Sequence, residues 1–283
     1  MSKRAFVLPV RGLGDVELTA AGVAGAVIFA LIVLSALLAP VLPLQSPLHL
    51  DLHHRFAAPF VDEHLLGTDQ LGRDLLSRVV YGGRSTLVIA SSATVFGVVV
   101  GTVLGLIAGF YRGFAETIIM RLVDIELSIP MMLLALLVIA VLGPSLLNLI
   151  VVLGLTAWVR AARMVRAEAM VLRSKDFVAA AYVMGVSPAR VLVRHLLPNV
   201  LSTVLTVATL ELSRIVLLEV SLSFLGLGAQ PPNPSWGRML AESRSYLSAS
   251  PWLIVVPGAA VLLTVLSINL ISDAVRRSLQ PQL

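Results

Sequence analysis

Long apolar runs constrain this chain more than any other feature of its sequence. Residues 85–111 and residues 127–159 contain no charged side chain. Each run exceeds the about 20 residues that an α-helix needs to cross the hydrocarbon core of a bilayer. Only 13% of the 283 residues are charged, against about 25% in soluble domains. The sequence therefore predicts an all-α membrane protein, because a helix satisfies its own backbone hydrogen bonds in lipid.

The apolar runs predict six transmembrane helices. The predicted spans cover residues 19–42, 85–111, 117–142, 145–165, 200–222 and 252–271. The third and fourth spans come from one run that is too long for a single span and that Gly143 and Pro144 interrupt. A shallow re-entrant hairpin is the alternative for this run. The remaining segments are an N-terminal segment (1–18), a first polar loop (43–84), a second one (223–251) and a basic tail (276–283).

Basic residues are distributed unevenly between the two sides that these spans separate. The side that carries both termini holds 14: Lys3, Arg4, Arg11, Arg112, Arg121, Arg160, Arg163, Arg166, Arg173, Lys175, Arg190, Arg194, Arg276 and Arg277. The other side holds six: Arg55, Arg73, Arg78, Arg84, Arg238 and Arg244. The positive-inside rule places the first side in the cytoplasm. The net charge of +5 follows these loops, so it gives no indication of nucleic-acid binding.

A polar, basic stretch at residues 176–199 lies between the fourth and fifth spans. Residues 166–182 lack Gly and Pro and predict a helix, which Gly185 ends in a left-handed conformation. Ser187 as N-cap and Pro188 as first residue begin a second helix, and Pro198 is predicted to stop it. We therefore expect two short helices that meet at a glycine bend. We call this element, residues 176–199, the knuckle, and we expect it to be a binding site for a partner.

Two patterns within the spans indicate packing and polar contacts. Gly97, Gly101, Gly105 and Gly109 recur every four residues, which lets two helix backbones approach closely, either within the chain or on another subunit. The fifth span carries Glu211, Arg214 and Glu219, and charges at membrane depth are costly unless they are paired or face a watery cavity. Glu211 and Arg214 can pair on one helix face. We leave open whether they form an internal salt bridge or line a translocation path, for which Glu219, without a near partner, is the better candidate.

The first polar loop carries the remaining polar clusters. His49, His53, His54 and His64 lie there, but prolines flank the cluster and no carboxylate framework accompanies it, so a solvated loop is favoured over a metal site. Leu71, Leu75, Leu76 and Val79 form an apolar stripe at helical spacing. This stripe predicts a short amphipathic helix on the outer surface, serving as a lid or as the contact of a partner that delivers substrate.

The sequence contains no motif of a known catalytic or nucleotide-binding site. There is no GxxxxGK[ST] loop, no GxSxG, HExxH or CxxC, and no cysteine at all. An intramembrane hydrolase is a remote alternative, because no histidine is placed near a serine of the spans. An ion-driven secondary transporter is also remote, because such proteins show paired interrupted helices in two halves. We therefore predict that this chain is no enzyme and binds no cofactor or metal.

Four segments resemble one family of membrane proteins. Alanines 179–181, Gly185, His195, Leu197 and Pro198 are similar to the EAA loop, EAA-xxx-G-x9-I-x-LP, of binding-protein-dependent ABC importers. The segments HLLGTDQLGRDLLSRVVYGGR (64–84), LSFLGLGAQPPNPSWGRMLAESRSYL (222–247) and PWLIVVPGAAVLLTVLSINLISDAVRRSLQPQL (251–283) resemble the second, C-type permease of the dipeptide, oligopeptide and nickel importers. The resemblance extends from about residue 15 to the end, and four motifs in the right order are specific.

The resemblance implies a type I ABC importer permease in the bacterial inner membrane, whose core domain is residues 85–275. It implies a heterodimer with a second permease, two cytoplasmic ATPases that bind ATP and Mg²⁺, an external substrate-binding protein, and contact with membrane lipids. Peptides, nickel chelates and haem are substrates of such importers. The residues expected to couple to the ATPases, within the loop 166–199, are Asp176, Ala179, Ala180, Ala181, Gly185, Arg190, Arg194 and Pro198.

The sequence departs from the family motif at two positions. Ala179 replaces the glutamate of the EAA motif, so a polar anchor to the ATPase is missing at this position. His195 occupies the usual isoleucine position, as is common in this subfamily. We therefore expect the knuckle to couple by shape and packing more than by a charge at position 179.

Overall fold

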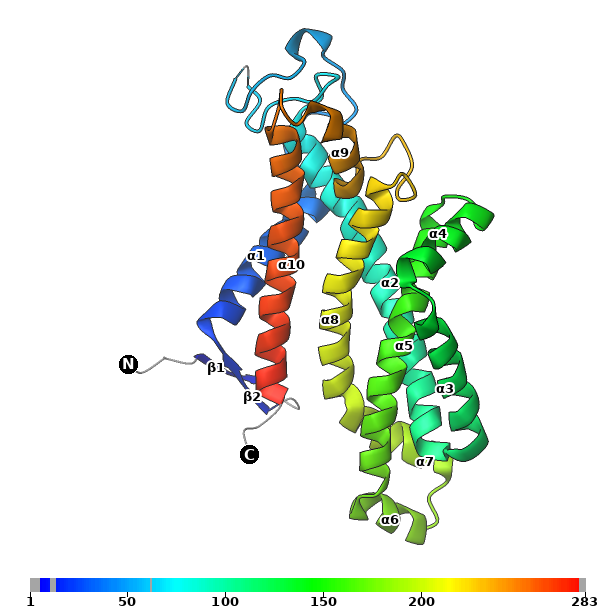
Figure 1. The fold of residues 1–283 in the computed structure, drawn as a ribbon. Helices are drawn as coiled ribbons and strands as arrows, with labels where there is room; N and C mark the ends of the chain where they lie inside the picture. Colours follow the sequence, from blue (N-terminus) through cyan, green and yellow to red (C-terminus); the bar gives the residue numbers. More distant parts are fainter. Residues whose placement is uncertain (1–5, 11–13, 62, 280–283) are drawn as a thin grey trace.

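The computed structural model describes residues 6–10, 14–61 and 63–279, and it is predominantly helical (Figure 1). The described α-helices are α1 (Ala20–Leu38), α2 (Leu75–Tyr111), α3 (Gly113–Ser128), α4 (Met131–Leu142), α5 (Leu146–Arg173), α6 (Asp176–Val183), α7 (Pro188–Val191), α8 (Leu197–Phe224), α9 (Trp236–Ser243) and α10 (Trp252–Leu279). Short turns η1 (Leu52–His54), η2 (Leu192–Leu196) and η3 (Arg244–Tyr246) accompany them. Within this part of the chain, five helices are long and apolar enough to cross a membrane, or six if the bent pair α3–α4 is one span.

The helices run lengthwise between two ends of the molecule. The α9 end holds α9 and the first polar loop, and the α6 end holds α6 and α7 (Figure 1). The spans predicted at 19–42, 200–222 and 252–271 correspond to α1, α8 and α10. The helix α10 runs on to Leu279, so Arg276 and Arg277 lie on a helix instead of in a separate tail.

The glycine stripe of α2 packs on α5 of the same chain. A Cβ atom added at Gly97, Gly101, Gly105 or Gly109 would lie only 2.5–3.0 Å from the Cβ atom of a residue on α5. The facing residues are Ala157, Ala161, Val165 and Ala169, which are also spaced by four. Two ridges of mostly small residues therefore bring the two backbones together, and the question of an internal or an external partner is answered in favour of an internal one.

The predicted surface helix and the second span form one continuous helix. The prediction of a separate amphipathic helix in residues 64–87 is wrong, because α2 begins at Leu75 and runs unbroken to Tyr111. Gly82 and Gly83 do not interrupt it. They make room for the indole of Trp236, whose Cζ2 atom lies 2.8 Å from a Cβ added at Gly83. These glycines thus serve the packing of α9 against the first turns of α2.

The predicted third span is broken in the middle. It was expected to be one helix over 117–142, but α3 and α4 are bent by 90° at Ile129 and Pro130. The cause is in the sequence: proline has no N–H group to donate, and it disfavours a helical conformation in the residue before it. Ile129 is extended accordingly, with φ −100° and ψ 126°.

Two helix boundaries around the knuckle also differ from the prediction. The helix α5 continues past residue 165 to Arg173, and Ser174 and Lys175 separate it from α6, so residues 166–182 are not one helix. Pro198 does not stop the second helix of the knuckle, since α7 passes through the π-turn η2 into α8. The wider turn, in which the N–H of Leu197 donates to the carbonyl of Leu192, precedes the proline and admits its ring.

The N-terminal segment contains the described strands, which the sequence analysis did not predict. Strand β1 (Phe6–Val10) pairs antiparallel with β2 (Gly14–Leu18), with Phe6 opposite Leu18. This hairpin lies beside the C-terminal part of α10 (Figure 1). Lys3, Arg4 and Arg11, which entered the charge count, lie outside the described residues.

We predict that Gly101→Ala destabilises the protein by about 1–3 kcal/mol, because the new methyl group would overpack the contact with Ala161. Thermal unfolding of the detergent-solubilised protein measures the loss of stability. The matched control is Gly258→Ala on α10, where nothing lies within 4 Å of the added Cβ. There, higher helix propensity is expected to stabilise the protein by up to about 1 kcal/mol. Equal effects of the two substitutions would contradict the close packing of α2 on α5.

Candidate functional site

The knuckle is built as two helices joined by a glycine bend, as predicted. The helix α6 ends in a Schellman motif: the N–H of Val186 donates to the carbonyl of Ala181, and the N–H of Gly185 donates to the carbonyl of Tyr182, both at 3.0 Å. Gly185 has φ +75°, and nothing lies within 4 Å of a Cβ placed there. Its role is therefore conformational, and Pro188 begins α7 immediately afterwards.

One face of the knuckle is packed on the long helices of its own chain. Val178 and Ala181 are buried in a cluster with Leu106 and Phe110 of α2 and Val165 of α5. The ring of Tyr182 is stacked on that of Phe110, with centroids 6.5 Å apart, and the guanidinium of Arg173 lies 6.0 Å from the centre of the Phe110 ring. These contacts fix α6 to α2 and α5.

The opposite face of the knuckle is exposed and partly apolar. Val183 and Met184 at its tip are 89% and 73% exposed, and Phe177 is 40% exposed. These apolar side chains lie on α6 and its bend, at the end of the molecule. The sequence analysis overlooked Val183 and Met184, although two apolar residues directly before the bend glycine, in an otherwise basic loop, were a usable signal.

The predicted coupling residues divide between these two faces. Ala181 is buried within the chain, at 1% exposure. The exposed ones are Asp176, Ala179, Ala180, Gly185, Arg190, Arg194 and Pro198. Asp176 lies in the first turn of α6, where its charge favours the helix N-terminus.

Glu211 and Arg214 of α8 form an internal ion pair. The Nε of Arg214 donates to Oε2 of Glu211 at 2.8 Å, and the carboxylate of Glu211 is buried. The guanidinium of Arg214 also donates to the carbonyl oxygen of Thr156 at 3.0 Å and contacts Sδ of Met131 at 2.9 Å. Arg214 thus joins α8 to α5 and to the first residue of α4, directly after the break at Pro130.

Glu219 does not lie where the sequence analysis placed it. It was expected to lack a near partner and to line a path, but its side chain is fully buried and accepts a hydrogen bond from the hydroxyl of Ser223 at 2.6 Å. Ser223 is one helical turn further along the same helix, so the spacing of four was a signal in the sequence. Glu219 is enclosed between helices and lines neither of the two pockets described below.

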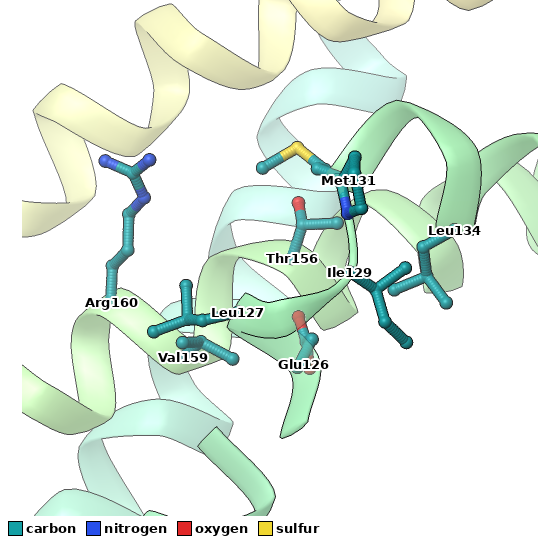
Figure 2. Close-up of a pocket in the computed structure, with 9 residues that line it drawn as sticks. Glu126, Leu127, Ile129, Met131, Leu134, Thr156, Val159 and Arg160 are labelled. Atoms are coloured by element: carbon teal, nitrogen blue, oxygen red, sulfur yellow. The ribbon is translucent and has the colours of Figure 1, made fainter. Parts of the chain in front are cut away.

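A pocket of about 220 Å³ opens at the break between α3 and α4 (Figure 2). Its lining combines apolar side chains with a few polar ones: Glu126, Leu127, Ile129, Pro130, Met131, Leu134, Thr156, Val159 and Arg160. A second pocket of about 300 Å³ adjoins it, lined by Arg160, Arg163, Met164, Val207, Leu210 and Glu211. Arg160 belongs to both. Arg160 and Arg163, expected at the end of the fourth span, lie instead in the middle part of the longer α5.

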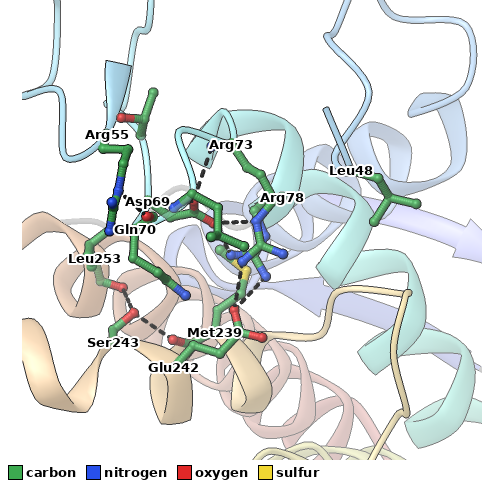
Figure 3. A network of polar contacts seen from close by, with 12 residues as sticks. Leu48, Arg55, Asp69, Gln70, Arg73, Arg78, Met239, Glu242, Ser243 and Leu253 are labelled. Carbon is green, nitrogen blue, oxygen red and sulfur yellow. Dashed lines mark hydrogen bonds and ion pairs between the residues drawn. The ribbon is translucent and has the colours of Figure 1, made fainter. Parts of the chain in front are cut away.

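A network of ion pairs holds the first polar loop at the α9 end (Figure 3). The buried carboxylate of Asp69 accepts hydrogen bonds from Arg73, at 2.7 Å, and from Arg78. Glu242 on α9 accepts from Arg78 at 2.8 Å, from Arg238 at 2.8 Å and from Arg73 at 3.1 Å. Two carboxylates therefore neutralise much of the positive charge at this end and join the loop, α2 and α9.

The pKa of Glu242 reflects this network. Burial by itself would raise its pKa, but the positive charge and hydrogen bonds of Arg78, Arg238 and Arg73 outweigh burial and hold it below the ordinary value of 4.5. Glu242 therefore stays ionised in the folded protein at neutral pH.

The histidines of the first polar loop form no metal centre in the part of the chain that the structure describes. His64 is buried, and its Nδ1 lies 2.9 Å from a carboxylate oxygen of Asp74. Asp74 also caps α2 by accepting the N–H of Ser77. His54 pairs with Asp51 at 2.7 Å. The expectation of a solvated loop is correct for His53, which is exposed, but His64 is part of the structural core of the loop.

The architecture is that of a helical membrane permease, and comparisons with known proteins identify its family. The family described as binding-protein-dependent transport system inner membrane component matches residues 101–283, more than half of the chain. A putative peptide transport system permease of Brucella suis is 39% identical over 100% of this chain and 97% of that protein. The dipeptide transport system permease of Alkalihalophilus pseudofirmus is 38% identical, over 92% of this chain and 86% of that protein.

Two further similarities agree with this result. The oligopeptide transport system permease of Escherichia coli is 39% identical over 93% of this chain and 87% of that protein. A chain of the MetNI methionine ABC transporter in an inward-facing conformation has the same fold, with a TM-score of 0.58 and 20% identity over 73% of this chain and 98% of that one. The chain belongs to the family of binding-protein-dependent transport system inner membrane components. It is a permease subunit of an ABC importer, with the type I fold that the sequence predicted.

We predict that Glu242→Gln destabilises the fold at neutral pH but not in acid. Because the pKa of Glu242 is lowered on folding, its charge stabilises the folded state above about pH 4.5, and this contribution is lost as the pH falls through the folded-state pKa. Thermal unfolding of wild type and variant is measured from pH 7 to about pH 3, and the difference between them should be constant down to about pH 4.5 and shrink below it. Glu63→Gln, at an exposed position of the same loop, should show no such convergence. A constant difference across this range would contradict the role of the charge.

Proposed function

We propose that this chain forms one half of the translocation path of an ATP-driven importer for dipeptides or oligopeptides. A second, homologous permease supplies the other half. Two ATPase subunits, which bind ATP and Mg²⁺, dock on the knuckle, and an external binding protein delivers the substrate to the α9 end. The peptide substrate is inferred from relatives that are named peptide, dipeptide and oligopeptide permeases. The same architecture could serve nickel chelates, haem or another small solute.

The exposed tip formed by Val183 and Met184 is the observation that carries the docking proposal. Apolar side chains this exposed, outside the length of the transmembrane helices, are stabilised when a partner covers them. The neighbouring Arg190 and Arg194 supply a polar rim, as is usual around an apolar interface core. Since Ala179 and Ala180 are exposed and small, the contact depends on shape at these positions.

The basic residues of the knuckle indicate the membrane orientation of the chain. The knuckle and its approaches carry Arg173, Lys175, Arg190 and Arg194 within a short loop. By the positive-inside rule the α6 end is cytoplasmic. The chain is then a multi-pass protein of the bacterial inner membrane with both termini in the cytoplasm.

Packing explains how the knuckle transmits movement. Its buried face is fixed to α2 and α5 through Phe110 and Arg173, and α2 and α5 are locked together by the glycine stripe. A push on α6 by a closing ATPase therefore moves the two helices as one body. The pocket at the α3–α4 break lies on α5 and moves with them.

We predict that Gly185→Val uncouples transport from ATP hydrolysis, because a β-branched side chain is strained at φ +75° and the bend would rearrange. ATP-dependent peptide uptake and ATPase activity are measured together in proteoliposomes that contain the complete importer. Gly185→Asn is the matched control, since asparagine tolerates the left-handed conformation and nothing obstructs its Cβ. Wild-type uptake by Gly185→Val at normal membrane levels would show that the bend has no coupling role.

We also predict that Val183→Cys forms cross-links to an ATPase subunit. The chain has no cysteine, so a thiol-reactive cross-linker acts in this chain only at the introduced position. Val255→Cys, on the exposed surface of α10 toward the α9 end, is the control and should give no such product. Cross-linking of Val255→Cys but not of Val183→Cys to the ATPase would refute both the docking surface and the orientation.

A labelled dipeptide tests the proposed substrate class. The complete importer in proteoliposomes, supplied with its binding protein and ATP, is expected to accumulate the dipeptide and to stop when ATP is withheld. If the same vesicles take up a nickel chelate or haem but no peptide, the proposed peptide substrate is wrong.

A further inference from the structure

Arg160 occupies an unusual position for an arginine. It lies 14 residues from the α9-end start of α5 at Leu146, which corresponds to about 21 Å along the helix axis. Glu211 lies 13 residues from the corresponding end of α8 at Phe224, or about 20 Å. Both distances are shorter than the about 30 Å thickness of a hydrocarbon core, and a charged side chain at membrane depth is retained for a function or a partner.

The neighbouring arginine has all the partners that it needs. Arg214 donates to Glu211 and to the carbonyl and hydroxyl oxygens of Thr156, and it contacts Met131. It is largely buried by these contacts. Arg214 is therefore a structural residue that joins three helices, and it is poorly placed to exchange its partners with a passing solute.

Arg160 differs from Arg214 in its exposure and in its hydrogen bonding. Its side chain is 56% exposed, and the nearest carboxylate oxygen, Oε1 of Glu211, lies 3.6 Å from its Nε, beyond hydrogen-bonding distance. Within the described residues, no hydrogen bond to its guanidinium is found. The planar fork of N–H donors is thus available, and carboxylates are the ligands that fit it in a bidentate manner.

The two pockets meet at this side chain. Arg160 is the one basic residue in the described lining of the pocket at the α3–α4 break, and Figure 2 shows it at the side of the pocket away from Glu126 and Leu134. The carboxylate of Glu126 already accepts a hydrogen bond from the indole of Trp158 at 2.7 Å. A solute that passes between the pockets therefore meets the free guanidinium of Arg160 beside a mostly apolar wall.

We propose that Arg160 binds the C-terminal carboxylate of the transported peptide, and that Glu211 is its counter-ion when no peptide is present. This inference rests on the proposed peptide substrate. A peptide of any sequence offers a carboxylate at its end, so this contact recognises the class of substrate without reading its side chains. Apolar residues such as Met131 and Val159 accept varied side chains nearby.

The test compares uptake of a labelled dipeptide with uptake of the same dipeptide amidated at its C-terminus. Each is loaded onto the binding protein before addition to proteoliposomes that contain the complete importer. Wild type should transport the free acid about tenfold faster or more, in line with the strength of a charge-assisted hydrogen bond. In Arg160→Gln the ratio of free-acid uptake to amide uptake should fall toward one, because uptake of the free acid is lost. Arg160→Lys should keep part of the preference, because it keeps the charge.

Arg121→Gln is the matched control, since Arg121 is an exposed arginine of α3 that lines neither pocket. It removes the same charge and should keep the wild-type preference. An unchanged preference in Arg160→Gln would overturn the inference. An equal loss of uptake of both peptides, with loss of the partner permease on purification, would also overturn it and assign Arg160 to the subunit interface. Transport of neither peptide by wild type would instead refute the proposed substrate class.

Discussion

The close packing of α2 on α5 is the contact on which the other features of this permease depend. Glycines on one helix and mostly alanines on the other remove the side chains that would keep the two backbones apart. In lipid, where burial of apolar surface gives little driving force between helices, such close contact supplies the attraction. The knuckle at one end, the loop network at the other and the pocket between them are all attached to this pair.

Charged residues in this apolar chain are paired differently at the α9 end and within the helix bundle. At the α9 end, Asp69 and Glu242 pair with three arginines, and the resulting network holds a long loop over the helices. Within the bundle, Glu211 and Arg214 satisfy each other and join α8 to its neighbours. Arg160 differs from Arg214, because it lies at ion-pair distance from Glu211, 3.6 Å, without a hydrogen bond from its guanidinium to any described residue. We propose that this loosely held arginine exchanges Glu211 for the carboxylate of the peptide.

The knuckle combines a rigid inner face with an exposed outer one. Its inner face is part of the core of the chain, so the position of α6 is set by α2 and α5. Its outer face ends in Val183 and Met184, which the described part of the chain leaves exposed. The loss of the family glutamate at Ala179 is compatible with this construction, because apolar contact and shape remain. In the proposed complex, coupling between subunits would depend on the fixed geometry of the bend at Gly185.

The sequence by itself determined the membrane class, the approximate positions of the long helices, the glycine bend and the family, since apolar length, glycine conformation and motif order are local properties. The break at Pro130 also has a local cause, but the sequence analysis did not identify it. Only the tertiary structure decided that the glycine stripe faces α5, that Ala181 and Glu219 are buried, and that Arg160 lies near Glu211 without a hydrogen bond to any described residue. Each of these depends on which helix lies opposite a residue, and helical spacing defines a face without defining its neighbour.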